Sequence, residues 1–252
     1  MNDARLVNSH RRRALQRGYS LIEVAVAMAV ALFLLGGMFT VLQSTRKNSG
    51  NQNLLAQLQE QERIAITMLT DVIQQAGYYP NAGTVTPANA LPASAAFTTA
   101  GQSLVGGTDA YGDFVTVRYE GDSSNSVLDC RGSPIANGTI EEMQFHVKPL
   151  NANVNAPPTL WCTVNGNDAP LVTNVQSISI TYGVDTSASG SVNAYLPASQ
   201  MAAYWTSVES VKLNVSFTNP LFGQPGQPNQ TISFNRVIGV MANSGVNVLV
   251  FK

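Results

Sequence analysis

A run of uncharged, apolar residues near the N-terminus places the strongest constraint on how this chain can fold. Residues 24–42 read VAVAMAVALFLLGGMFTVL, with no charged residue and no proline. As a helix with a rise of about 1.5 Å per residue, the run approaches the roughly 30 Å hydrocarbon core of a bilayer. We therefore expect residues 24–42 to cross a membrane.

A cluster of arginines precedes the apolar run. The cluster consists of Arg11, Arg12, Arg13 and Arg17. Because basic residues stay on the cytoplasmic side, they predict a cytoplasmic N-terminus and a remainder that lies across the membrane. No small-residue cleavage site bounded by a helix break follows the run, so we expect the apolar segment to be retained. A simple signal anchor is the plainest interpretation of these features.

The rest of the chain favours one continuous helix leading into a head. Apolar residues recur at helical spacing after the polar stretch that follows the membrane segment, and Gly77 suits a helix stop. These apolar residues are Leu54, Leu58, Ala65, Met68, Leu69, Val72 and Ala76. The pattern predicts a helix over 19–76. Gly36 and Gly37, each about 1 kcal/mol worse than alanine in a helix, and the polar stretch 48–53 are candidate breaks.

Strand patterns dominate the C-terminal two thirds. Residues 80–110 are rich in Pro, Gly, Ala and Thr and predict a long loop. Alternating apolar residues predict strands at 113–120, 141–148, 175–184, 210–217, 230–237 and 245–251, with a short helix at 197–205. Because no long helices separate them, we expect an antiparallel sheet. One helix followed by strands gives an α+β fold.

The two cysteines, Cys130 and Cys162, suggest one disulfide in an oxidising compartment. Two buried free thiols are the alternative.

Little in the sequence points to catalysis or ligand binding. Of the two histidines, His10 lies near the N-terminus and His146 lies alone on a predicted strand. Glu141 and Glu142 are adjacent, so they point to opposite faces of a strand. The stretch NGNDAP at 165–170 offers oxygen ligands for calcium but fits a plain Asn-Gly turn better. We expect no enzyme activity, no metal and no cofactor. Charged residues make up 12% of the chain with a net charge of −1, which gives no support for a nucleic-acid site.

The stretch GYSLIE at 18–23 resembles the processing site of type IV prepilins, which follows a short basic leader. The resemblance implies that prepilin peptidase cuts between Gly18 and Tyr19 and that Tyr19 is then N-methylated. Tyr19 departs from the family's usual phenylalanine. Glu23 becomes the fifth residue of the mature chain, where the family carries its glutamate.

Glu23 has two interpretations. A buried carboxylate needs a partner, and the resemblance implies that it pairs with the amino terminus of a neighbouring subunit and so fixes axial register. The simpler interpretation is a glutamate near its own helix N-terminus, where negative charge is favourable.

Several stretches of the head resemble the PilW group of minor pilins. They are QERIAITMLTDVIQQAGYY, DFVTVRYEG, LWC with the preceding Cys130, LVTNVQSISITYGVD and VESVKLNVSF. The ending GVMANSGVNVLVF does not match, so the role of residues 239–252 is undefined. The resemblance implies a cleaved leader at 1–18, a long helix at 19–76, a β-rich periplasmic head at 77–252 and, for the protein as a whole, a type IV pilin-like fold.

This resemblance also implies a structural role. Minor pilins of this kind help to start pilus assembly and are incorporated at or near the pilus tip, where they support twitching motility and adhesion. Their partners are other minor pilins, the major pilin and the inner-membrane assembly platform. Two alternatives remain open at this point: a J-type pseudopilin of type II secretion, and a signal-anchored periplasmic binding protein or enzyme.

Overall fold

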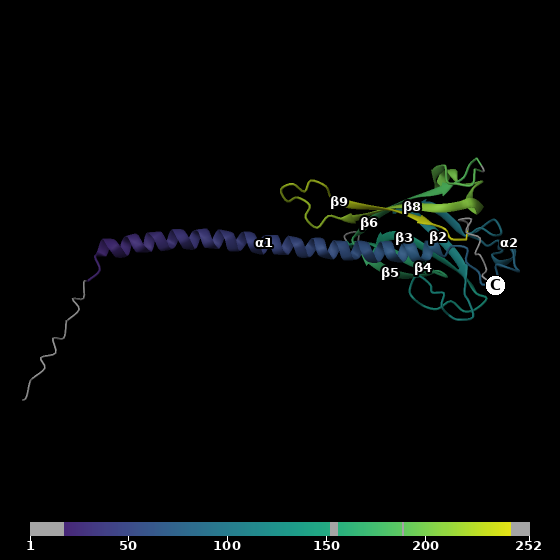
Figure 1. Cartoon of the computed structure of the whole chain (residues 1–252), viewed down its shortest axis with the longest axis horizontal. Coiled ribbons are helices and arrows are strands. Elements are labelled where there is room, and N and C mark those ends of the chain that lie inside the picture. The colour runs from purple at the N-terminus through teal and green to yellow at the C-terminus, as the bar shows by residue number, and fades with distance from the viewer. Residues whose placement is uncertain (1–17, 152–155, 188, 243–252) are drawn as a thin grey trace, which may run out of the picture. The chain divides into compact units, whose positions relative to one another are not determined.

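A computed structural model describes residues 18–151, 156–187 and 189–242 (Figure 1). The contacts divide the chain into two units, residues 1–52 and 53–252, and each is described by itself. His10 and the predicted strand 245–251 lie outside the described residues.

One long helix, α1, runs from Leu21 to Gln74. Its bounds lie within two residues of those predicted at each end. The candidate breaks did not appear, since Gly36, Gly37 and Gly50 all lie inside the helix. The hydroxyl of Thr40 donates to the Gly36 carbonyl at 2.9 Å, so this carbonyl accepts a side-chain hydrogen bond in addition to the bond of the helix.

The last turns of α1 pack onto the head through one apolar stripe. Its buried residues are Leu58, Ala65, Leu69, Val72 and Ile73. Of the predicted stripe, Leu54 is exposed and Met68 is half-buried, because they lie at its margins. Gly77 ends the helical path with φ of +80° and donates its amide to the Arg118 carbonyl at 2.9 Å. A side chain at Gly77 would crowd Ser103 and Ala242.

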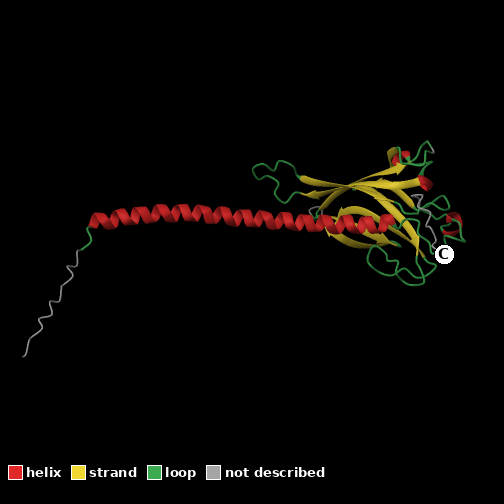
Figure 2. Ribbon diagram, in the orientation of Figure 1, coloured by secondary structure: helices red, strands yellow, loops and turns green. Residues whose placement is uncertain are grey.

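The first of two sheets has five antiparallel strands in chain order (Figure 2). They are β1 (Leu104–Asp109), β2 (Gly112–Glu120), β3 (Ile140–Pro149), β4 (Pro158–Val164) and β5 (Asn167–Thr173). The prediction of a long loop at 80–110 was wrong, since this range contains the short helix α2 (Pro87–Ala90) and the whole of β1. Val105, Gly106 and Gly107 give β1 little apolar alternation, so its pairing with β2 decides its conformation.

The hairpin between β4 and β5 was not predicted as strands, although its turn was. Asn165 and Gly166 both have positive φ, 50° and 80°. Two such residues between antiparallel strands form the tight turn that Asn-Gly favours. The plain turn expected at 165–170 is therefore present, and strands flank it on both sides.

The second sheet has four antiparallel strands in the order β7-β6-β8-β9. They are β6 (Val175–Val184), β7 (Ala194–Pro197), β8 (Val208–Thr218) and β9 (Thr231–Gly239). The short helix expected at 197–205 is instead two 3-10 turns, η1 (Ala198–Gln200) and η2 (Trp205–Ser207).

The predicted faces of the strands meet in one core. The rows that start at Val115, Met143, Ile178 and Val211 are buried together with the stripe of α1. The two sheets contact each other where β6 lies against β2, β3 and β4. There the backbone amide of Ile180 donates to Asp113 at 2.9 Å, and Gly106 leaves room for the buried ring of Tyr182.

Candidate functional site

The start of α1 presents a carboxylate on an otherwise apolar helix. Gly18, Tyr19 and Ser20 precede the helix, and the Tyr19 side chain is 81% exposed. The Ser20 carbonyl accepts from the amides of Glu23 (3.0 Å) and Val24 (3.2 Å), which closes the first turn. Glu23 lies in that turn, where the positive end of the helix dipole stabilises it. Among the described residues, Glu23 forms no ion pair.

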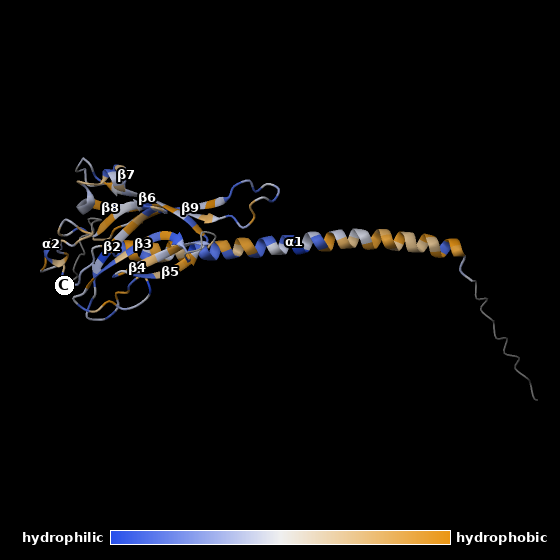
Figure 3. Cartoon of the chain, turned by 180° about the vertical axis from the view of Figure 1, so that it is seen from behind, coloured by the Kyte–Doolittle hydropathy of each residue, from blue (hydrophilic) through white to orange (hydrophobic). Residues whose placement is uncertain are grey.

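The helix that follows Glu23 is apolar on every side. Figure 3 shows this part of α1 coloured almost entirely as hydrophobic. All of residues 24–42 are exposed, and in the described chain this is the one helix long and apolar enough to cross a membrane. Apolar surface of this extent requires lipid or protein cover. The helix can therefore serve as an anchor or as a packing surface for other subunits.

The predicted disulfide is present between Cys130 and Cys162. It ties the loop between β2 and β3 to the inner side of β4, with a Cα–Cα distance of 6.4 Å. The loop has further supports, since the Tyr119 hydroxyl donates to the Leu128 carbonyl at 2.6 Å and Asp129 forms an ion pair with Arg131 at 2.8 Å. Burial, with help from Asp129, raises the pKa of Tyr119 well above its usual value.

The adjacent glutamates of β3 point to opposite faces, as predicted. The Ser94 hydroxyl donates to Glu142 at 2.5 Å on the outer face, the face of the five-stranded sheet that points away from α1. Glu141 lies on the inner face, where burial and then the charge of Asp129 raise its pKa. The two carboxyl groups therefore do not form a catalytic pair.

A buried arginine that sequence reasoning did not single out fixes the segment over the outer face. The guanidinium of Arg118 donates to the carbonyls of Gln102 (2.7 Å), Pro92 (2.5 Å) and Leu91 (3.1 Å). It also lies 4.3 Å from the ring centre of Phe97. Its side chain is almost completely enclosed, and this burial lowers its pKa. The strand pattern places Arg118 on the face opposite the apolar row of β2, so nothing in the sequence indicated that its side chain is buried.

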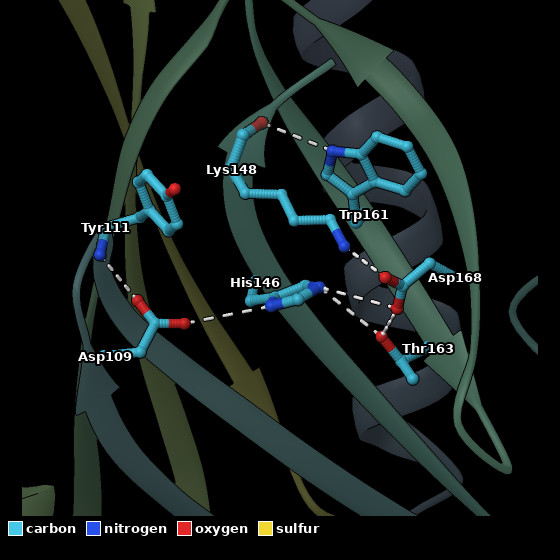
Figure 4. A network of polar contacts seen from close by, with 7 residues as sticks. All are labelled: Asp109, Tyr111, His146, Lys148, Trp161, Thr163 and Asp168. Atoms are coloured by element: carbon cyan, nitrogen blue, oxygen red, sulfur yellow. Dashed lines mark hydrogen bonds and ion pairs between the residues drawn. The ribbon is translucent and has the colours of Figure 1, made fainter. Parts of the chain in front are cut away.

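A polar group that we call the outer-face cluster surrounds His146 (Figure 4). Its members come from β1, β3, β4 and β5: Asp109, His146, Lys148, Trp161, Thr163 and Asp168. His146 Nδ1 lies 3.8 Å from Asp109, and Nε2 lies 3.9 Å from Asp168. Lys148 and Thr163 both contact Asp168 directly, and together they lower its pKa.

The geometry of the outer-face cluster does not suit a metal site. The two carboxylates approach opposite nitrogens of the His146 ring, so one ion cannot bind the ring and both acids. Burial, and then the charge of Lys148, lowers the pKa of His146. In the part of the chain that the structure describes, no group of three His, Cys, Asp or Glu side chains is placed to hold a metal ion. The cluster is a cross-strand network on a sheet surface.

Comparisons with known proteins match two parts of the chain. Residues 133–235 match the family of type IV pilus-assembly protein W, PilW, and residues 13–39 match the prokaryotic N-terminal methylation motif. The second match contains Gly18, Tyr19 and Glu23. A solved type IV-like pilin from Thermus thermophilus aligns with a TM-score of 0.41 at 12% identity, covering 73% of this chain and 96% of that one. No protein of curated function matches the chain.

The family matches agree with the features found in the structure. The methylation motif coincides with the turn that opens α1, and the PilW match runs from β3 through most of β9. These two matches, over residues 133–235 and 13–39, support a type IV pilus minor pilin of the PilW family.

Proposed function

We propose that this minor pilin helps to start type IV pilus assembly at the inner membrane and is incorporated at or near the pilus tip. Its N-terminus lies in the cytoplasm, its head in the periplasm and later on the pilus outside the cell. There it supports twitching motility and adhesion. The PilW match and the exposed apolar start of α1 support this proposal.

The observation that carries the proposal is the position of Glu23. It is the one acidic residue on the apolar part of α1, and it stands five residues after Gly18. In hydrocarbon or in a filament core, an unpaired carboxylate costs at least about 2.5 kcal/mol. Prepilin peptidase cleaves between Gly18 and Tyr19 and leaves a cationic amino group on N-methylated Tyr19. The amino group of a neighbouring subunit then neutralises Glu23 and fixes the register between subunits.

The processing step is tested by mass spectrometry of the N-terminus. The full chain is expressed with and without prepilin peptidase. With the peptidase, the mature chain begins at Tyr19 and carries one added methyl group, whereas Gly18→Leu blocks cleavage. A leader that stays attached in the presence of active peptidase would sink the pilin proposal.

The assembly role of Glu23 is tested separately. Glu23→Ala is expected to be processed normally but to enter pili poorly. Glu60→Ala is the matched control, because it removes an exposed carboxylate from the same helix well beyond the apolar segment. If Glu23→Ala enters sheared pili as well as the control does, Glu23 does not set the register.

The predicted partners are other minor pilins, the major pilin and the inner-membrane assembly platform. Deletion of the gene is expected to reduce surface pili and twitching and to leave type II secretion unchanged. Loss of secretion with normal piliation would assign the chain to the J-type pseudopilins instead.

A further inference from the structure

The apolar helix begins shortly after the proposed cleavage site. Gly18, Tyr19 and Ser20 lie outside α1, and Leu21 is the first helical residue. Proteases cut exposed backbone that is free of regular structure, because the peptide groups of a helix are occupied by its internal hydrogen bonds. The position at which α1 begins therefore decides whether the bond between Gly18 and Tyr19 is available.

Ser20 occupies the N-cap position of this helix. Its carbonyl accepts the first helical hydrogen bonds, from the amides of Glu23 at 3.0 Å and Val24 at 3.2 Å. Serine is among the residues that favour this position most, because its hydroxyl can accept a hydrogen bond from an amide of the first turn. Ser20 and Glu23 also have the S-x-x-E spacing that is typical of helix starts. The cap uses only the backbone amide of Glu23, so Glu23→Ala leaves it in place.

Tyr19 occupies the position before the cap. Its side chain lines a hollow on the side of α1 together with Val24, the fourth helical residue. An apolar residue before the cap often packs against the fourth helical residue and fixes the angle at which the chain enters the helix. Ser20 and the pair of Tyr19 and Val24 therefore set the same helix start.

The residues before the cleavage site make such a boundary necessary. Residues 11–17 read RRRALQR, and arginine, alanine, leucine and glutamine all have high helix propensity. Propensity alone would allow a helix to run from them into α1 and to include the bond that is cut. Gly18 opposes this, since glycine is the poorest helix former after proline. A Cβ at Gly18 would meet nothing within 4 Å, so no contact in the described chain requires glycine there.

We propose that Ser20 is a positioning residue for the cleavage of the leader. As the N-cap, it holds the start of α1 at Leu21 and so keeps the bond between Gly18 and Tyr19 outside the helix, where prepilin peptidase can bind it. Ser20 acts through the helix start and does not touch the reacting atoms. The inference rests on the proposed function, because it concerns the same processing step.

A set of substitutions at position 20 tests this role. The full chain in detergent is mixed with purified prepilin peptidase, and loss of the leader is followed over time by mass spectrometry. Ser20→Ala removes the cap and should slow cleavage about fivefold, whereas Ser20→Asn keeps a cap and should be cleaved at the wild-type rate. Recognition of a small side chain by the peptidase would produce the reverse order, with Ser20→Ala faster than Ser20→Asn, and would overturn the proposal.

A matched pair of variants and a rescue variant test the helix start itself. Threonine and valine have nearly the same shape, but only threonine can cap a helix, so Ser20→Thr should be cleaved faster than Ser20→Val. Proline is favoured at the first helical position and keeps the residue before it out of the helix. Ser20→Ala combined with Leu21→Pro should therefore recover cleavage to within about twofold of wild type. A double variant as slow as Ser20→Ala, or equal rates for Ser20→Thr and Ser20→Val, would contradict the role of the cap.

The same assay separates this inference from the proposed function. Wild type that keeps its leader in the presence of active peptidase contradicts the proposed function. Wild type that is cleaved, with Ser20→Ala cleaved equally fast, contradicts only the role of Ser20. Denaturation midpoints of the head should be the same in every variant, because position 20 lies outside residues 53–252, so a change in rate does not come from an unfolded head.

Discussion

Replacing Arg118 should release the segment that covers the outer face of the five-stranded sheet. Arg118→Met keeps an unbranched apolar stem against Phe97 but removes all three hydrogen bonds to the carbonyls of Leu91, Pro92 and Gln102. The loss of these hydrogen bonds affects the three carbonyls differently. Leu91 retains a second donor, the Gly101 amide at 2.8 Å, and Pro92 is exposed and can bind water.

The magnitude follows from this inventory. Leaving the buried Gln102 carbonyl without its donor destabilises the fold by about 1–3 kcal/mol, and loss of the contact between the guanidinium and Phe97 adds about 1–2 kcal/mol. The variant regains part of this, because a guanidinium no longer has to be desolvated. We expect a net loss of about 3 kcal/mol in the free energy of unfolding, or roughly 6–12 °C in Tm for a chain of this size.

Chemical denaturation and hydrogen exchange of the full chain in detergent measure this effect. Amides from Leu91 to Leu104 should lose protection in Arg118→Met before those of β8. Arg118→Lys keeps the charge but cannot reach all three carbonyls, so its stability should lie between those of Arg118→Met and wild type. If Arg118→Met unfolds like wild type and the segment keeps its protection, Arg118 does not hold the segment.

Three further predictions concern the head. The double variant Cys130→Ser with Cys162→Ser should lose about 3–4 kcal/mol, because the bond closes a loop with a sequence separation of 32; unchanged denaturation midpoints under oxidising conditions would contradict this. Gly106→Ala should lower the free energy of unfolding by about 1–3 kcal/mol, since the added Cβ would overlap the buried tyrosine hydroxyl of β6. Gly239→Ala is the control, because its Cβ meets open space and should leave thermal unfolding nearly unchanged. Burial, and then a neighbouring lysine, lowers the pKa of His146, so the unfolded chain protonates this imidazole at a higher pH than the folded chain does. The free energy of unfolding should therefore drop below about pH 6.5. His146→Gln should reduce that drop in a series of thermal melts.

The strand faces illustrate what alternation can predict. The rows at Val115, Met143, Ile178 and Val211 are strictly periodic, and all four are buried as expected. Alternation failed where strands carry glycine or proline, as in β1 with Gly106 and Gly107 and in β5 with Pro170. These strands exist because a neighbour supplies their hydrogen bonds, and a single-strand pattern does not contain that information.

The polar residues of the head illustrate the opposite case. Arg118 and His146 lie on faces that the pattern assigns to solvent, yet each is largely covered in the structure. The cover comes from residues far away in the chain, such as the segment near Leu91 and the carboxylate of Asp168. No local signal marks these contacts.

By itself, the sequence determined the apolar helix, the position of Glu23, the likeness to a prepilin processing site and the antiparallel character of the head, because each depends on short stretches of neighbouring residues. The tertiary structure alone decided that the strands divide into two sheets and that Arg118 is buried. These features depend on which strands meet, and hydrogen bonds between distant segments settle that choice.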